Sequence, residues 1–177
     1  METEKKRYIA PEVLFGLIEE ELREGRKASF VVTGMCMWPF ICHGRDSVVI
    51  EPVTRPASTP DEEKEAPRDL KIGDIVLLKI PHINGSHKYI LHRITHIRKE
   101  EGLIETTGDG NIYRDGWFPV EYVVARVAEI EYRGRTIDVN SGSQRILSAV
   151  WRSLFPVRPG ILRLLRGISK VKRRIRR

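Results

Sequence analysis

The feature that most constrains the fold of this chain is a succession of short runs rich in Val, Ile, Thr and Tyr, many separated by glycines, with no helical pattern between them. Such residues favour extended strands, and strands that follow one another without intervening helices pair antiparallel. We therefore expect a mainly β domain over residues 29–139, built as a coiled or partly open antiparallel β-barrel. The runs are Ser29–Thr33, Ser47–Glu51, Asp74–Ile80, Lys88–Ile97, Leu103–Thr107, Tyr122–Tyr132 and Thr136–Val139.

Two further segments complete the first part of the chain. Pro11–Arg26 places apolar residues at steps of three and four, with glutamates on the other side, which predicts an amphipathic helix. We expect this helix, within residues 1–28, to pack on the barrel. Residues 52–70 contain four prolines and a cluster of acidic residues, which indicates a polar loop inserted in the β domain. Such a loop could be a lid or a plain surface insertion, and the sequence leaves both open.

The last segment, residues 140–177, differs sharply in charge from the rest. Residues 1–138 carry 20 basic and 24 acidic residues, a net of −4, whereas residues 139–177 carry 11 basic and no acidic residues, a net of +11. Two apolar stripes, interrupted by Pro156 and Pro159, predict a basic amphipathic helical tail. An anionic membrane surface is the favoured partner. Nucleic acid is less favoured because no aromatic stacking face accompanies the arginines. Packing of the tail on the barrel remains an alternative.

Composition excludes several classes of protein. Two cysteines in 177 residues exclude a disulfide scaffold, and no apolar run is long enough to span a bilayer. The N-terminal residues are charged and lack the apolar centre of a signal peptide. We therefore expect a cytoplasmic protein, either free or peripheral on the inner face of the membrane. The oligomeric state stays open.

Three residues could together perform nucleophilic chemistry. Cys36 lies in a turn just past a predicted strand, where a thiol can face a substrate, and a thiol reacts as the thiolate when a base or cation is near. His92, on an apolar strand, is the best-placed base. Asp115 or Asp109 could orient its ring, and backbone N–H groups of the Cys36 turn could hold an oxyanion. The alternative from the residues alone is a free buried cysteine with an ordinary core histidine.

A different chemistry for the cysteines is also open. Cys36 and Cys42 could form a redox pair or, together with His43, a metal site. The histidines His87, His92 and His96 do not share one face of a strand, because the step from His87 to His92 is odd. A metal site built on that strand is therefore not expected.

Several segments of the chain resemble, in order, the type I signal peptidase family over roughly Phe30–Val127. Aligned on the Met-x-Pro of the family's nucleophile motif, Cys36 takes the position of the nucleophilic Ser. The His followed by Arg and an apolar residue is similar to the archaeal and endoplasmic-reticulum branch, which uses His where bacterial enzymes use Lys. The matching segments are Gly34-Met35-Cys36-Met37-Trp38-Pro39, Gly44-Arg45-Asp46, Gly73-Asp74-Ile75-Val76, Leu91-His92-Arg93-Ile94 and Gly108-Asp109-Gly110-Asn111, followed by Asp115.

The resemblance implies an endopeptidase with the fold of that family, which signal peptidases share with the self-cleaving repressors. Cys36 would be the nucleophile, His92 the general base and Asp115 the residue that orients His92. Asp109 and Met37, which belong to the matching motifs, are further site candidates. The resemblance implies no cofactor and no metal. The substrate would be a leader or precursor peptide bound as an extended strand, with small residues just before the cut.

The chain departs from the family in three ways. The nucleophile position holds Cys and not Ser, and we expect neither the membrane anchor of the signal peptidases nor the N-terminal DNA-binding domain of the repressors. A Cys–His pair is chemically sound, but a thiol in a site shaped for a hydroxyl can also be misplaced. The alternative to an active peptidase is therefore an impaired or non-catalytic module that holds a peptide by strand addition.

Overall fold

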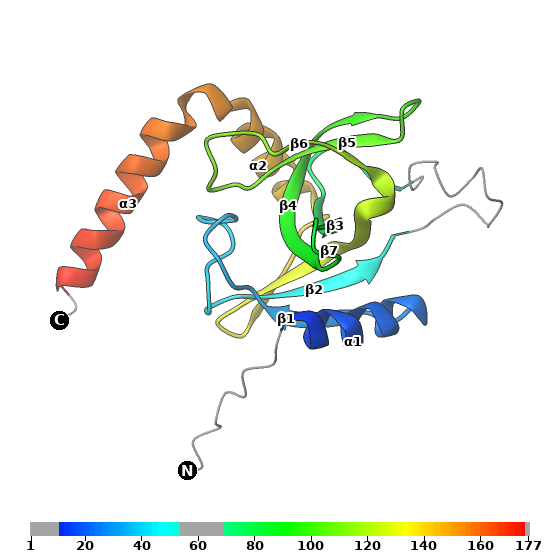
Figure 1. The fold of residues 1–177 in the computed structure, drawn as a ribbon. Helices are drawn as coiled ribbons and strands as arrows, with labels where there is room; N and C mark the ends of the chain where they lie inside the picture. The colour runs from blue at the N-terminus through cyan, green and yellow to red at the C-terminus, as the bar shows by residue number, and fades with distance from the viewer. Residues whose placement is uncertain (1–10, 54–68, 176–177) are drawn as a thin grey trace, which may run out of the picture.

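The computed structural model describes residues 11–53 and 69–175 and shows one antiparallel sheet of eight strands with helices at both ends of the chain (Figure 1). This confirms the predicted mainly β, antiparallel class. The sheet does not close into a barrel among the described residues, because β1 and β6 are its two edges. The strands are β1 (Ala28–Val31), β2 (Ser47–Pro52), β3 (Ile75–Pro81), β4 (His87–Arg98), β5 (Leu103–Thr107), β6 (Gly116–Pro119), β7 (Val123–Tyr132) and β8 (Arg135–Asp138).

The sheet combines local hairpins with one long-range pairing. The strand order is β1-β2-β7-β3-β4-β5-β6, and β8 pairs with β7. Strands β3 to β6 follow one another as neighbours, whereas β7 returns to lie between β2 and β3. Its register shifts against both of these neighbours, and such bulges bend a sheet. Strand β4 is long and visibly curved (Figure 1).

Two apolar clusters lie on opposite faces of β3, as the two-residue period of a strand requires. Ile75 and Leu77 belong to one cluster, with residues of β2, β7 and the N-terminal helix. Val76 and Leu78 belong to the other, with residues of β4, β5 and the start of β7. All four side chains are buried, so the middle of the sheet is covered on both faces.

The N-terminal helix α1 (Pro11–Arg23) packs beside β1 and β2 (Figure 1). Its Ile18 and Leu22 are buried in the first cluster, which agrees with the predicted packing. The helix ends three residues before the predicted Arg26, because Gly25 adopts φ +76° and donates to the Leu22 carbonyl at 3.0 Å. A glycine in this left-handed conformation terminates many helices.

The C-terminal tail forms α2 (Gly142–Ser153), a short 3-10 turn η3 (Phe155–Val157) and α3 (Arg158–Ile175). Helix α2 packs on the body through Ser148 and Trp151, which are buried. The predicted break at Pro156 is confirmed, but α3 already begins before Pro159, since a helix tolerates proline in its first turn. Helix α3 runs along the outside of the molecule, apart from the sheet (Figure 1). Among the described residues, no helix combines the length and apolarity needed to cross a bilayer.

Strand β6 was not expected, because its four residues, Gly-Trp-Phe-Pro, carry no period and form a strand only by pairing with β5. The predicted loop over residues 52–70 falls mostly outside the described residues, which stop at Val53 and resume at Asp69.

Candidate functional site

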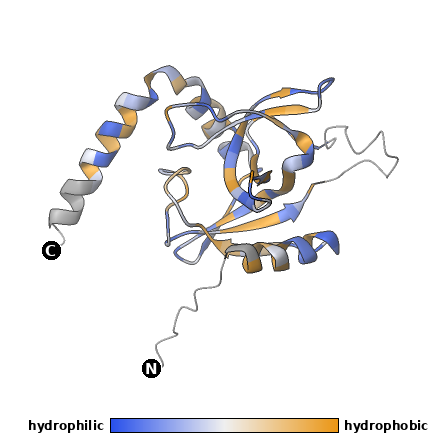
Figure 2. Cartoon of the chain, viewed as in Figure 1, coloured by the Kyte–Doolittle hydropathy of each residue, from blue (hydrophilic) through white to orange (hydrophobic). Residues whose placement is uncertain are grey.

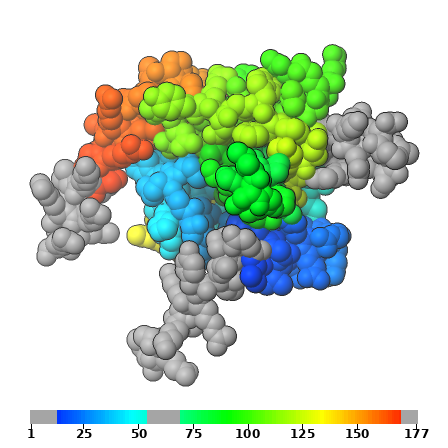
Figure 3. Space-filling view, in the orientation of Figure 1, coloured from blue at the N-terminus to red at the C-terminus, as the bar shows by residue number. Residues whose placement is uncertain are grey.

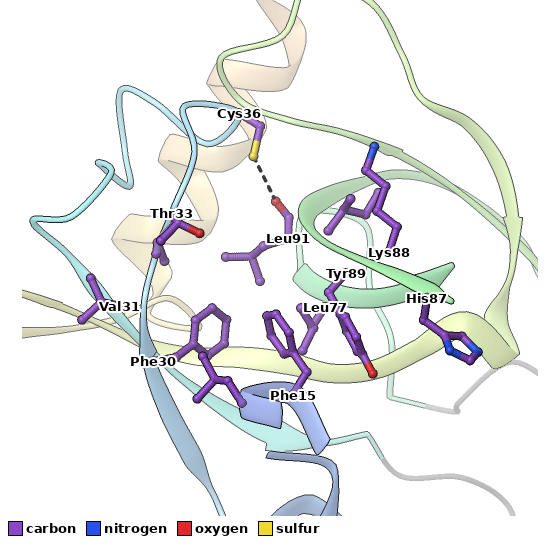
Figure 4. A pocket seen from close by; sticks show the side chains of 13 residues that line it. Phe15, Phe30, Val31, Thr33, Cys36, Leu77, His87, Lys88, Tyr89 and Leu91 are labelled. Carbon is purple, nitrogen blue, oxygen red and sulfur yellow. Dashed lines mark hydrogen bonds between the residues drawn. The ribbon is translucent and has the colours of Figure 1, made fainter. Parts of the chain in front are cut away.

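Cys36 lies in a compact turn that follows β1. The Trp38 N–H bonds to the Met35 carbonyl at 3.2 Å and the Ile41 N–H to the Met37 carbonyl at 3.0 Å, so the backbone folds back on itself around Cys36. The thiol is half-buried and donates to the Leu91 carbonyl of β4, with sulfur and oxygen 3.9 Å apart (Figure 4). The turn therefore presents Cys36 to the middle of β4.

His92 is the next residue on β4, and Asp115 orients its ring. The two atoms His92 Nδ1 and Asp115 Oδ2 are 2.5 Å apart. Thr106 of β5 fixes Asp115 twice, since its hydroxyl donates to the same carboxylate oxygen at 2.9 Å and its carbonyl accepts from the Asp115 N–H at 3.0 Å. With Nδ1 bonded to a carboxylate, Nε2 is the nitrogen left to exchange a proton with a nucleophile.

The surroundings of His92 favour its charged form. Burial opposes that form, but hydrogen bonds to Asp115 and to Cys36, together with the charges of both groups, outweigh burial and raise the pKa of His92 from 6.5 to about 9. The ring therefore carries a proton at neutral pH. A charged imidazole beside a cysteine is an arrangement that cysteine nucleophiles use.

Asp109, the other candidate for orienting His92, makes a different contact. Its two oxygens accept from Arg93 Nε at 2.9 Å and Nη2 at 2.7 Å, and both side chains are buried. Arg93 also donates to the Gly73 carbonyl at 2.8 Å and to the Ser148 hydroxyl at 3.2 Å. His92 and Arg93 are neighbours on β4 and point to opposite faces. His92 therefore contacts Asp115 on one face of β4, and Arg93 contacts Asp109 on the other.

The loop that carries Asp109 packs directly on the Cys36 turn. Gly110 donates its N–H to the Cys36 carbonyl at 2.7 Å. A Cβ at Gly108 would lie 2.5 Å from the Cys36 carbonyl oxygen, and one at Gly110 would lie 2.7 Å from the Met35 oxygen. Only glycine permits this approach, which gives the Gly-Asp-Gly sequence a physical reason.

The C-terminal helices contact the same loop through Trp151 and Arg158. The Trp151 indole N–H donates to the Asp109 carbonyl at 3.2 Å, and its ring meets Phe40, after the Cys36 turn, edge to face at 5.2 Å. Arg158, buried at the start of α3, donates to the carbonyls of Gly108 and Asn111, both at 3.4 Å. The tail thus contacts both loops that surround Cys36.

A pocket of about 410 Å³ opens beside the thiol. Strand β1 and the following residues form one wall and the beginning of β4 the other (Figure 4). Phe15 of α1 stacks on Tyr89 at 4.2 Å and meets Phe30 edge to face at 5.5 Å, so aromatic side chains form its floor. The volume is within the roughly 300–1,000 Å³ of ligand sites.

The remaining candidates lie apart from this arrangement. The side chain of Met37 is buried in the first apolar cluster and is not exposed at the site. Cys36 and Cys42 are both free thiols, and Cys42 donates to the Pro39 carbonyl at 3.8 Å. His43 Nδ1 accepts the Gly34 N–H at 2.9 Å. Over residues 11–53 and 69–175, no group of three or more His, Cys, Asp or Glu side chains is arranged to hold a metal ion.

Comparison with known proteins returns no match among family models, curated proteins or solved structures. The resemblance to signal peptidases therefore rests on the sequence motifs alone.

Sequence reasoning missed four residues that support the site. Arg93 stands in the His-Arg motif, which was a usable signal. Thr106, Trp151 and Arg158 gave none, because each acts through a contact with residues far along the chain.

Proposed function

We propose that this protein is a signal-peptidase-like endopeptidase that cleaves a leader or precursor peptide through an acyl-enzyme on Cys36. The observation that carries the proposal is the continuous chain of contacts from Asp115 through His92 to Cys36, at the mouth of an apolar pocket. An ordinary core histidine has no need of a half-buried carboxylate, a held orientation and a neighbouring thiol together.

The reaction begins with the thiolate of Cys36. It attacks the scissile carbonyl carbon and forms a C–S bond, and the carbonyl oxygen becomes an oxyanion. When the C–N bond breaks, the His92 imidazolium gives its proton to the leaving amine, and a thioester remains. Neutral His92 then takes a proton from water as that water attacks the thioester. The sulfur then leaves as the Cys36 thiolate, which releases the acid product and restores the pair of thiolate and His92 imidazolium.

The backbone of the Cys36 turn supports the oxyanion. The Trp38 N–H is already used by the Met35 carbonyl, so the N–H groups of Cys36 and Met37 are the donors that we assign to it. This gives Met37 a role through its backbone, while its side chain fills the core.

The substrate lies beside β1 as an extended strand. β1 is an edge of the sheet and pairs only with β2 among the described residues, so its other edge can pair with a peptide main chain. A substrate side chain near the cut then enters the pocket between β1 and β4.

The test is cleavage of a peptide library by the full chain and by four variants. Cys36→Ala and His92→Ala should each lower kcat/KM by about a thousandfold or more. Cys42→Ser, which removes the other half-buried thiol, should cleave like wild type. Cys36→Ser tests whether the site accepts oxygen. A peptide chloromethylketone should form an adduct on Cys36 that is lost in His92→Ala.

Two results would contradict the proposal. Equal cleavage by wild type and Cys36→Ala would remove Cys36 from the chemistry. Absence of cleavage, with peptides bound equally by wild type and Cys36→Ala, would identify a non-catalytic peptide-binding module instead.

A further inference from the structure

Helix α3 packs against the body of the protein with one side and exposes another. Arg158 and Leu162 are each only 1% exposed. Two residues further along, Leu164 is 66% exposed, and Ile168 is 44% exposed. Burial of one side of the first turns fixes the helix to the site, and residues 163–169 lie at the molecular surface (Figure 3).

The exposed and half-buried apolar residues of α3 share one side of the helix. Ile161, Leu164, Leu165 and Ile168 follow one another at steps of three and four, which places them in one stripe. Hydrophilic and hydrophobic residues alternate along the helix in Figure 2. A stripe of this kind in water is unfavourable unless another apolar phase covers it.

The positive charge of the tail indicates which apolar phase covers the stripe. Residues 139–177 carry 11 basic and no acidic side chains. Arg163 and Arg166, on the polar side of α3, are exposed, and the Arg166 guanidinium also lies over the Trp38 ring, 5.9 Å from its centroid. A free polyanion such as duplex nucleic acid would engage the arginines but leave Leu164 and Ile168 in water. An anionic bilayer binds both the arginines and the apolar residues, because acyl chains cover the stripe and lipid phosphates pair with the cations.

We infer that α3 binds the surface of an anionic bilayer and lies in its interface. The apolar stripe from Ile161 to Ile168 faces the acyl chains, and Arg163 and Arg166 reach the headgroups. The inference goes beyond the cleavage reaction and does not depend on it, since it stands on α3 alone.

The experiment is co-sedimentation of the full chain with vesicles. One set contains phosphatidylcholine alone and the other contains one third phosphatidylglycerol. Binding should be strong on the anionic vesicles, weak on the neutral ones, and reduced by 0.5 M salt. The double variant Arg163→Gln/Arg166→Gln should bind the anionic vesicles about thirtyfold more weakly, at about fivefold per removed cation.

The apolar stripe is tested by Leu164→Glu/Ile168→Glu, which should lower vesicle binding by roughly a hundredfold or more. The matched control is Ile83→Glu, which changes a fully exposed isoleucine in the turn between β3 and β4 and should bind like wild type. Thermal unfolding checks that all variants fold.

Three outcomes overturn the inference. The first is equal binding to neutral and anionic vesicles. The second is binding to duplex DNA, but not to vesicles, at the same salt concentration. The third is self-association that the stripe variant abolishes while vesicle binding is absent in wild type, which would identify a second copy of the chain as the cover.

Discussion

Replacing Asp115 with asparagine should remove a pH-dependent part of the stability of this protein. In the folded protein the pKa of His92 is raised to about 9, whereas its ordinary value is 6.5. Between these two pH values the folded state holds a proton that the unfolded state has released. The slope of the unfolding free energy is then about −1.4 kcal/mol per pH unit.

The magnitude follows from the two pKa values. A difference of about 2.5 units corresponds to about 3 kcal/mol, and the ring is 6% exposed, so solvent screens the interaction little. Because the folded pKa is the higher one, this stabilisation is fully present below pH 6.5 and is lost as the pH rises through 9. The amide introduced by Asp115→Asn keeps a hydrogen-bond acceptor beside Nδ1 but carries no charge, so most of the stabilisation should disappear.

The assay is urea unfolding of both proteins at intervals from pH 5.5 to 10. Wild type should exceed Asp115→Asn by up to about 3 kcal/mol at pH 5.5–6.5, since Cys36 contributes the smaller part of the shift, and the two curves should converge near pH 10. Asp138→Asn, on the exposed strand β8, is the control and should follow wild type. Parallel curves for wild type and Asp115→Asn from pH 6.5 to 9 would refute the reasoning, since the carboxylate would then not be what holds the proton on His92.

Three further changes test the surroundings of the site. Arg93→Met leaves the buried Asp109 carboxylate without its bidentate partner and should cost about 3–5 kcal/mol of unfolding free energy in urea; a loss below about 1 kcal/mol would show that water replaces the arginine. Trp151→Ala removes the contacts to both loops around Cys36 and should lower the free energy of unfolding by about 3–5 kcal/mol. The rate of Cys36 alkylation should change as well. An unchanged rate would show that α2 does not support the position of Cys36. Phe15→Ala deepens the aromatic floor of the pocket, so library cleavage should shift toward larger apolar side chains near the cut, whereas an unchanged preference would place the substrate elsewhere.

The sequence predicted the fold class because the patterns that indicate it are local. β-branched residues in short runs, glycines at their ends and a helical period in two other segments each act over fewer than about twenty residues. The predicted strands therefore agree with the observed ones to within one or two residues, with Lys88–Ile97 observed as His87–Arg98. The exception, β6, has no local pattern and exists because β5 pairs with it.

The candidate site, too, was predicted from the sequence only in part. Its motifs indicated Cys36 and His92, but the residues alone left Asp109 and Asp115 both open as the partner of His92. The structure decides between them through the strand period, since His92 and Arg93 face opposite sides of β4 and each side holds one aspartate. No spacing along the chain contains that information.

By itself, the sequence determined the strands other than β6, the helices, the residues capable of nucleophilic chemistry and the basic character of the tail, because each of these depends on residue type and short-range spacing. Only the tertiary structure decided how far the sheet closes, which aspartate serves His92, and that α2 packs against the site while α3 exposes its apolar stripe. These depend on contacts between residues distant in sequence, such as Trp151 with Asp109. Packing brings such residues together only once the whole chain has folded.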